Sequence, residues 1–298
     1  METVISKDGS RIAYDRYGAG PTVILVGGAL SYRTFNKMEE LARLLGERCT
    51  VINYDRRGRG DSTEVKPFSV EREIEDIAAL IEVADGSASL WGWSSGGALG
   101  LRAAGTGIGV DKVSVYEVPF MVTPEAKRPT RDYGERLDEL VAAGDRRGAV
   151  KHFMRNSMGI PAPFVALMRL MPMWKGLKAT AHTLPYDWAA LGAHTMYGAP
   201  LNAEEWASVT APTLVVSGAK SPAVLREGSR ALAEALPNAR LHELAGVSHN
   251  VKMEVLAPVL AGFFAGDAAN ATPPPEANQA PASDDPSSRG AASPPRPG

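Results

Sequence analysis

The chain has 298 residues, of which 44% are hydrophobic, enough for one sizeable buried core. Its formal net charge of −2 gives no electrostatic reason to expect nucleic acid or a membrane as partner. The single cysteine, Cys49, excludes a disulfide framework and is expected to be a buried structural thiol. Neither a targeting segment nor an apolar run of bilayer-spanning length is apparent. We therefore expect a cytoplasmic protein that acts on a small-molecule substrate.

Five short, β-rich apolar runs predict strands that are buried on both faces of a parallel sheet. These runs are Thr22–Val26, Thr50–Tyr54, Ala88–Gly92, Val113–Tyr116 and Thr213–Val216. Helical patterns lie between them, such as Val70–Ile81 behind a Ser69 cap, and later ones cover Ala223–Leu236 and Val251–Phe264. This alternation predicts a doubly wound α/β fold.

One stretch interrupts the alternation. Residues 120–208 hold no strand-like run but many Met, Trp and Pro residues, which predicts a helical insertion. We therefore expect a first part of the α/β core at residues 1–119, a helical cap at 120–208 and the second part of the core at 209–266. The Pro/Ala/Ser-rich tail, 267–298, has no large apolar side chain to bury and is expected to be disordered.

The sequence Gly92-Trp93-Ser94-Ser95-Gly96-Gly97 follows a predicted strand and opens a predicted helix. A nucleophilic serine needs such a sharp turn to lift its hydroxyl clear of the backbone, and the strained turn needs small neighbours. Negative charge that develops beside the serine is stabilised by the helix N-terminus. The pattern therefore favours Ser94 as a nucleophile over an ordinary Gly/Ser turn.

Together with this turn, three further stretches resemble the α/β-hydrolase family: Val26–Ala29, Asp55–Ser62 and Gly246–His249. The resemblance covers nearly all of residues 1–264, and it implies a mostly parallel sheet with a helical cap inserted before the penultimate strands. It also implies that the backbone N–H groups of Ala29 and Ser95 form an oxyanion hole. No metal and no organic cofactor is expected.

The motif Asp55-Arg56-Arg57-Gly58-Arg59-Gly60-Asp61-Ser62 is open to a catalytic or phosphate-binding interpretation, but we favour a structural one. Its glycines suit turns with positive φ, and its charged side chains are suited to satisfy loop backbone groups. The pattern also lacks the G-x-x-x-x-G-K-[ST] of a phosphate-binding loop.

Five histidines compete for the role of general base. His152, His182 and His194 lie in the insertion without paired helical spacing, and His242 lies within a strand-like run. His249 lies on a Gly-flanked loop before the last helix, where the resemblance places the base. A near-neutral pKa suits a group that takes and returns a proton.

The third member of a catalytic triad is harder to assign. The family usually carries an Asp after the strand at Thr213–Val216, but here that position holds Ser221, which precedes a proline and is expected to cap a helix. Glu117 follows the strand at Val113–Tyr116, where some members of this fold place the acid. Glu117 is the favoured candidate, ahead of Asp187 and Glu243.

Two assignments stay open. The apolar segment Phe164–Met171 is suited either to wall a substrate pocket or to be buried between cap and core. Trp93, beside the nucleophile, faces either the pocket or the core.

These residues predict a carboxylic ester hydrolase that acts on a small ester, lactone or thioester. Ser94 attacks, His249 takes its proton, and an acyl-enzyme forms and is hydrolysed. Two alternatives remain. One is a cofactor-free perhydrolase or lyase on the same Ser–His pair. The other, suggested by the missing acid at Ser221, is a binding protein on a hydrolase scaffold.

Overall fold

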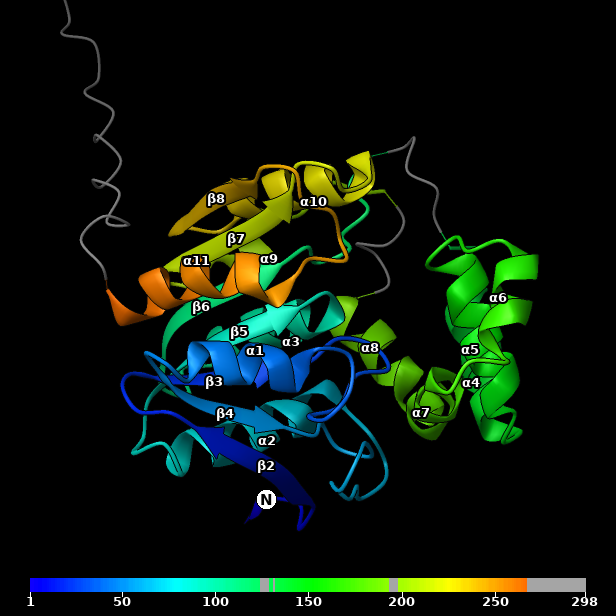
Figure 1. Cartoon of the computed structure of the whole chain (residues 1–298), viewed down its shortest axis with the longest axis horizontal. Helices are drawn as coiled ribbons and strands as arrows, with labels where there is room; N and C mark the ends of the chain where they lie inside the picture. The colour runs from blue at the N-terminus through cyan, green and yellow to red at the C-terminus, as the bar shows by residue number, and fades with distance from the viewer. Residues whose placement is uncertain (124–128, 131, 193–197, 267–298) are drawn as a thin grey trace, which may run out of the picture.

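A computed structural model describes residues 1–123, 129–130, 132–192 and 198–266 of the chain. Its centre is a single twisted sheet of eight strands (Figure 1). The strands are β1 (Glu2–Ile5), β2 (Arg11–Tyr17), β3 (Thr22–Val26), β4 (Thr50–Tyr54), β5 (Ala88–Trp93), β6 (Val110–Tyr116), β7 (Thr213–Gly218) and β8 (Ala239–Leu244).

The strand order is β1-β2-β4-β3-β5-β6-β7-β8, and β4 through β8 run parallel. Only β1 and β2 pair antiparallel, β1 with β2 and β2 with β4. The order reverses around β3, so loops after β3 and β5 meet at the carboxyl edge of the sheet. In open α/β sheets this switch point is where ligands bind.

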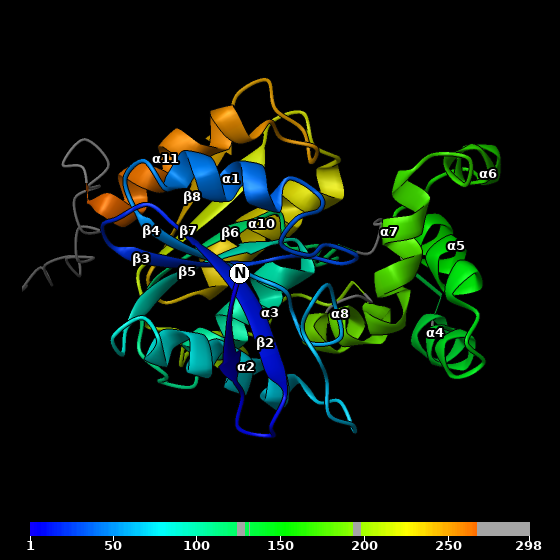
Figure 2. The ribbon, with the colours of Figure 1, turned by 60° about the horizontal axis from the view of Figure 1, so that its bottom comes forward.

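Helices cover both faces of the sheet (Figure 2). On β3, Val23 and Leu25 join one apolar cluster while Ile24 and Val26 join another, because alternate side chains point to opposite faces. The first face carries α1 (Met38–Leu45) and α11 (Met253–Ala265). The second carries α2 (Val70–Glu82), α3 (Ser95–Ala104) and α10 (Ala223–Ala235).

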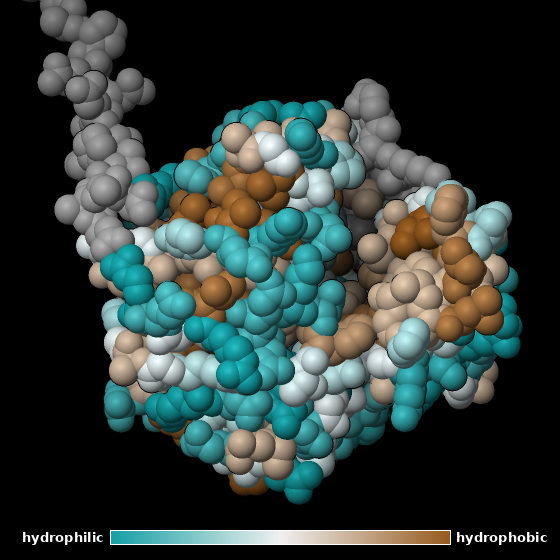
Figure 3. Space-filling view, viewed as in Figure 1, coloured by the Kyte–Doolittle hydropathy of each residue, from teal (hydrophilic) through white to brown (hydrophobic). Residues whose placement is uncertain are grey.

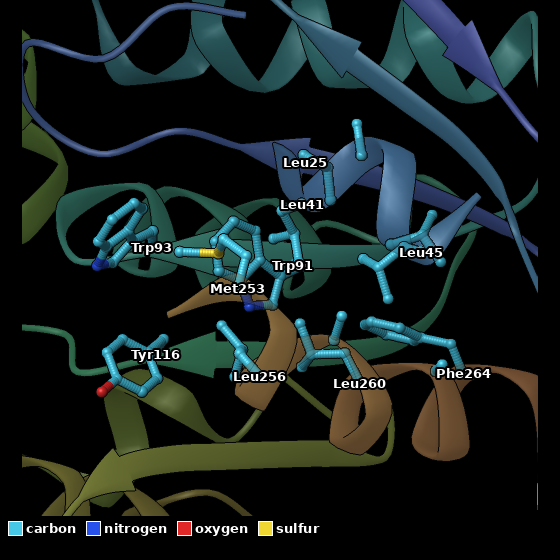
Figure 4. Packing of buried hydrophobic residues seen from close by; sticks show 14 of the residues in the cluster. Leu25, Leu41, Leu45, Trp91, Trp93, Tyr116, Met253, Leu256, Leu260 and Phe264 are labelled. Carbon is cyan, nitrogen blue, oxygen red and sulfur yellow. The ribbon is translucent and has the colours of Figure 1, made fainter. Parts of the chain in front are cut away.

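The first face holds the large aromatic side chains next to the predicted nucleophile. Trp91 and Trp93 have ring centroids 6.2 Å apart, and Met253 and Leu256 of α11 belong to the same cluster, with Met253 drawn next to Trp91 (Figure 4). Trp93 is 7% exposed, so it belongs to the core rather than to an open pocket. Cys49 is buried in the same cluster, and burial raises the pKa of its thiol. The end of β5, which leads into the turn at Ser94, is therefore packed against buried side chains on this face.

The five predicted strands are confirmed, and β5, β6 and β7 extend beyond the predicted runs. Ser69 caps α2 as expected, accepting a hydrogen bond from the Arg72 amide at 3.4 Å. The sequence analysis missed β1 and β2. These two antiparallel strands at one side of the sheet mix exposed polar and buried residues, so neither forms a continuous apolar run.

The segment between β6 and β7 is helical throughout its ordered elements, and the described part of 120–208 contains no strand. Its helices are α4 (Tyr133–Ala142), α5 (Arg146–Asn156), α6 (Ala162–Met168), α7 (Met173–Thr180), the 3₁₀ turn η1 (Ala181–Thr183), α8 (Leu184–Leu191) and α9 (Ala203–Trp206). Helices α4 to α7 form a lobe beside the sheet, while α8 packs on α3 (Figures 1 and 2). Val165 is the one buried residue of α6, so this helix is not buried between cap and core.

The predicted tail, residues 267–298, lies outside the described residues. Within the described ranges, no helix is both long and apolar enough to cross a bilayer.

The arginine side chains of the Asp55–Ser62 loop after β4 form a network of buried ion pairs between the core and the cap. Arg56 donates to both carboxylate oxygens of Glu73 at 2.7 Å and to Asp187 Oδ1 at 2.6 Å. Arg59 donates to Asp187 Oδ2 at 2.8 Å. Both arginines and Asp187 are at most 3% exposed, which supports the structural interpretation of this motif over a phosphate site.

Asp187 lies on α8 and is therefore the cap's contribution to this network. Burial alone raises the pKa of Asp187, but the guanidinium groups of Arg59 and Arg56 outweigh it, so the pKa lies below its ordinary value. The carboxylate is thus held ionised at neutral pH. It stabilises the folded state above the unfolded pKa of about 4, and this contribution is lost as the pH falls through the lower folded pKa.

Asp187→Asn is expected to lower the free energy of unfolding at pH 7 by about 3–5 kcal/mol, because it leaves two buried guanidinium groups short of a counter-charge. Urea titrations measure this difference, which should shrink as the pH is lowered below about 4. The matched control is Glu39→Gln, which removes the exposed Arg43–Glu39 pair and should leave the melting temperature unchanged. A difference that stays constant down to pH 3 would contradict this account.

Candidate active site

Ser94 occupies a strained turn between β5 and α3. Its backbone has φ 55° and ψ −124°, a conformation that non-glycine residues rarely adopt. The Ser94 amide donates to the Tyr116 carbonyl at 2.9 Å, and its carbonyl accepts from Gly97 at 2.9 Å. Ser94 is part-exposed while its neighbours are buried, so the turn presents this one side chain at the surface.

The glycines around Ser94 are required by close backbone contacts. A Cβ on Gly92 would lie 2.4 Å from Gly97 Cα, and one on Gly96 would lie 2.2 Å from the Val26 carbonyl oxygen. Both distances are far below van der Waals contact. The predicted strand–turn–helix setting is therefore present, with small residues where the turn needs them.

His249 and Glu117 lie in direct contact. His249 Nδ1 is 2.6 Å from Glu117 Oε2, within the hydrogen-bond distance that the predicted pairing requires. An ionised carboxylate only accepts, so the Nδ1–H donates and Nε2 of the neutral ring is left as an acceptor. The His249 ring also lies 6.4 Å from Trp93 and 6.3 Å from Tyr116, measured between ring centroids. These contacts place the imidazole over the residue that precedes Ser94.

Glu117 is fully buried and is held by more than the histidine. Its Oε1 accepts from the Gly218 amide at 2.7 Å, and its own amide donates to the Val216 carbonyl at 3.1 Å. Its backbone has φ 46°, a left-handed conformation that costs a glutamate free energy. The end of β6 is thus bent so that the carboxylate lies between β7 and the histidine loop.

Tyr116 was not singled out from the sequence, yet it fixes the histidine loop. Its hydroxyl donates to the Ser248 carbonyl at 2.8 Å. Burial, with the nearby Glu117 charge, raises the pKa of Tyr116, which keeps the hydroxyl a donor at neutral pH. The sequence feature that could have indicated Tyr116 is its position immediately before Glu117, at the end of β6, the strand that pairs with β5.

The loop after β7 differs from the prediction. Ser221 was expected to cap α10, but α10 begins at Ala223 with Pro222 at the N-cap position and no side-chain cap. The Ser221 side chain is instead buried, and its Oγ would lie 3.0 Å from a Cβ on Gly218. Lys220 donates its amide to the Val247 carbonyl at 2.7 Å, so this loop packs directly against the histidine loop.

The other polar candidates have different surroundings. His152 donates from Nε2 to the Tyr133 carbonyl at 3.1 Å, and burial lowers the pKa of its imidazole. His182 lies 3.9 Å from Glu64, too far for a hydrogen bond. His242 and Glu243 are exposed on β8. Asp187 belongs to the buried arginine network, and His194 lies outside the described residues.

Gly28, which precedes the predicted oxyanion donor Ala29, lies against the turn at Ser94. A Cβ on Gly28 would lie 2.7 Å from the Trp93 carbonyl oxygen and 3.2 Å from Ser94 Cβ. Ser95 is the first residue of α3, so its N–H has no acceptor within the helix. Both predicted donors are therefore near Ser94. A hollow between core and cap is visible from the outside (Figure 3).

Within the described ranges, no cluster of three or more His, Cys, Asp or Glu side chains has a geometry suited to a metal ion.

Gly96→Ala is expected to cost about 3 kcal/mol of stability, because its methyl group would collide with the carbonyl oxygens of Val26 and Gly27. Gly100→Ala on the same helix is the matched control. Its Cβ would meet nothing closer than Leu90 at 4.0 Å, so it should stabilise the protein by about 0.5–1 kcal/mol. Urea unfolding of both variants measures the contrast, and equal stabilities would refute the packing argument.

The comparisons with known proteins agree with this fold. Residues 23–281 match the model of the alpha/beta hydrolase family. An alpha/beta hydrolase from Sphaerobacter thermophilus DSM 20745 is 46% identical, with 88% of this chain and 100% of that chain covered and a TM-score of 0.80. A thermophilic esterase from Thermogutta terrifontis is 21% identical, with 88% and 97% covered and a TM-score of 0.61.

A further relative is much longer. The polyketide synthase ThaQ of Burkholderia thailandensis is 28% identical over 283 residues, which cover 86% of this chain but 12% of that protein. The family match spans most of the sheet, the turn at Ser94 and the loop at His249. The chain therefore belongs to the alpha/beta hydrolase family, and its fold is the one predicted from the sequence.

Proposed function

We propose that this protein is a serine hydrolase that cleaves a small carboxylic ester, lactone or thioester through an acyl-enzyme. The observation that carries the proposal is the 2.6 Å contact between His249 Nδ1 and the fully buried Glu117 carboxylate. The His249 ring lies 6.4 Å from the ring of Trp93, the residue before the strained and part-exposed Ser94. This arrangement supplies a nucleophile, an oriented imidazole and a fixed negative charge.

In the first step, Ser94 Oγ forms a bond to the substrate's acyl carbon while His249 Nε2 takes the hydroxyl proton. The imidazolium that results is stabilised by Glu117, which also holds the ring in the productive tautomer. The bond to the leaving group then breaks, and His249 returns the proton to the leaving oxygen or sulfur. A water molecule deprotonated by the same Nε2 attacks the acyl-enzyme, releasing the acid and restoring Ser94.

Charge on the carbonyl oxygen is proposed to be met by the N–H groups of Ala29 and Ser95. Support comes from the other end of the Gly28–Ala29 peptide. Arg59 donates from Nη1 to the Gly28 carbonyl at 2.7 Å, and in a trans peptide the Ala29 N–H points the opposite way. The Ser95 hydroxyl donates to Asp187 Oδ1 at 2.8 Å. One Arg59–Asp187 pair thus holds both peptides that supply the donors.

The binding-protein alternative was suggested by the absence of an acid at Ser221. The Glu117–His249 contact removes that reason, since a carboxylate does meet the imidazole. A perhydrolase or lyase would use the same Ser–His pair with a different second reactant. Turnover of p-nitrophenyl esters of graded acyl length, with and without hydrogen peroxide, separates these chemistries.

Ser94→Ala is expected to abolish hydrolysis of every p-nitrophenyl ester that the wild-type protein cleaves, because the neighbouring Ser95 hydroxyl is buried and donates to Asp187. Labelling by a fluorophosphonate probe should disappear with it. The melting temperature should change little, since a part-exposed hydroxyl contributes little packing. Retained activity in the purified variant would end the serine-hydrolase proposal.

Glu117→Gln should lower kcat by up to about 10⁴-fold, because the amide keeps a hydrogen bond but removes the charge that orients and stabilises the imidazolium. Glu117→Asp should also be impaired, since its carboxylate is one methylene short of His249. Ser221→Asp is expected to rescue Glu117→Gln in part, because its loop packs against the histidine loop.

Glu243→Gln is the matched control for this series, since Glu243 is exposed on β8. It should retain wild-type kcat and KM. If Glu117→Gln were as active as Glu243→Gln, Glu117 would have no role beyond packing.

A further inference from the structure

The charge of the cap segment between Arg146 and Tyr186 is unlike that of the rest of the chain. These 41 residues contain seven Lys or Arg residues and no Asp or Glu, although the whole chain has a net charge of −2. The seven cations are Arg146, Arg147, Lys151, Arg155, Arg169, Lys175 and Lys178, and all are exposed. None of them forms an ion pair with another described residue.

The same segment exposes most of the large apolar side chains found on the described surface. These are Met158 (50%), Phe164 (60%), Leu167 (60%), Leu170 (83%), Met171 (48%) and Met173 (36%). They are carried by α6, by the turn that follows it and by adjoining residues. The space-filling view shows apolar side chains gathered over this outer end of the lobe (Figure 3). Six neighbouring side chains of this size form a patch rather than scattered exposures.

Cations and apolar side chains meet at this end of the cap. Arg169 lies between Leu167 and Leu170, and Lys175 follows Met173 by two residues. On the adjoining side, a shallow hollow of about 470 Å³ between α5 and α7 is lined by four cations, Arg146, Arg147, Lys175 and Lys178, against one carboxylate, Asp145. The surface therefore offers apolar side chains for insertion and positive charge around them.

We propose that this surface, residues 146–178 of the cap, binds the anionic surface of a lipid bilayer. Apolar side chains enter the headgroup–acyl boundary while neighbouring Lys and Arg side chains meet lipid phosphates. The inference goes beyond the proposed hydrolase activity and concerns residues that touch neither Ser94 nor His249. The net charge of the whole chain does not reveal this cationic segment, because acidic residues elsewhere offset the seven cations.

Other occupants fit these observations less well. In a symmetric contact with a second copy, the seven cations would face their own equivalents, which is repulsive. An acidic protein would pair with the cations but would leave the exposed apolar side chains of Phe164–Met171 without an apolar partner. Both remain as outcomes of the test.

The test is co-flotation of the full-length protein with vesicles, half phosphatidylglycerol and half phosphatidylcholine, against pure phosphatidylcholine. Binding is expected only to the anionic vesicles and should weaken with added salt, because surface attraction is screened within a Debye length. Lys175→Glu with Lys178→Glu should weaken partitioning by about tenfold or more. Leu167→Gln with Leu170→Gln should also weaken it, and this loss should persist at high salt.

The matched control combines Arg230→Glu and Val255→Gln, which change an exposed cation and an exposed apolar residue outside the cap. This variant should bind as the wild type does. All variants should keep the wild-type melting temperature and turnover of a short soluble ester. These readouts separate failure of this proposal from failure of the hydrolase proposal.

Three results would overturn the proposal. One is equal flotation with neutral and anionic vesicles, or none with either. The second is binding to soluble polyglutamate that competes with vesicles and is unaffected by Leu167→Gln with Leu170→Gln, which would indicate an acidic protein partner. The third is a wild-type dimer in sedimentation that the same variant converts to a monomer, which would assign the surface to a second copy.

Discussion

Two arginines of the loop after β4 share one buried carboxylate from the cap, and this contact links the cap to Ser95 and to the Gly27–Gly28 segment. Asp187 binds Arg56 and Arg59, which bind the carbonyl oxygens of Gly27 and Gly28 at 3.2 and 2.7 Å. These charges are buried, so separating one partner would leave the other as an unpaired buried charge, which is strongly destabilising. The Gly27–Gly28 segment, part of the proposed oxyanion loop, is therefore bound by the same ions that hold α8 to the core. Movement of the cap and distortion of the loop are energetically coupled.

The position of the proposed acid follows from the geometry of the parallel sheet. The strands β5, β6 and β7 are neighbours, so side chains after their carboxyl ends meet at one edge. A carboxylate that reaches the histidine loop from β6 must extend past the end of β7, and Glu117 does so while binding the Gly218 amide on its way. The left-handed backbone at Glu117 directs the side chain toward that gap. The glutamate side chain of Glu117, one methylene longer than aspartate, and its left-handed backbone together allow the proposed acid to come from β6. No acidic residue is then needed at position 221.

Much of this arrangement is readable from the sequence, and the exceptions have physical reasons. The strands β3 to β7 are predictable because burial on both faces requires continuous apolar runs, whereas β1 and the neighbouring β2 mix exposed and buried residues. The turn at Ser94 is predictable because its strain demands glycines at fixed positions. The partners of Arg56 and Arg59 are not, since Asp187 lies more than 120 residues away and only folding brings it near. The N-cap of α10 was predicted at Ser221 but lies at Pro222, because a Ser-Pro pair fits a helix start whether the serine or the proline is the N-cap.

Whole-chain averages conceal where a protein places its charge. A net charge of −2 argues against an anionic partner only if the charges are mixed evenly, and here a 41-residue segment of the cap carries none of the 34 acidic residues. In the loop after β4, Arg56 and Arg59 are buried and bind carbonyl oxygens and carboxylates next to Ser95 and the Gly27–Gly28 segment. In the cap, cations of the same kind are exposed beside unburied Leu, Met and Phe side chains. Since one protein uses arginine in both ways, its role is decided by burial and by the carboxylates within reach, neither of which composition reveals.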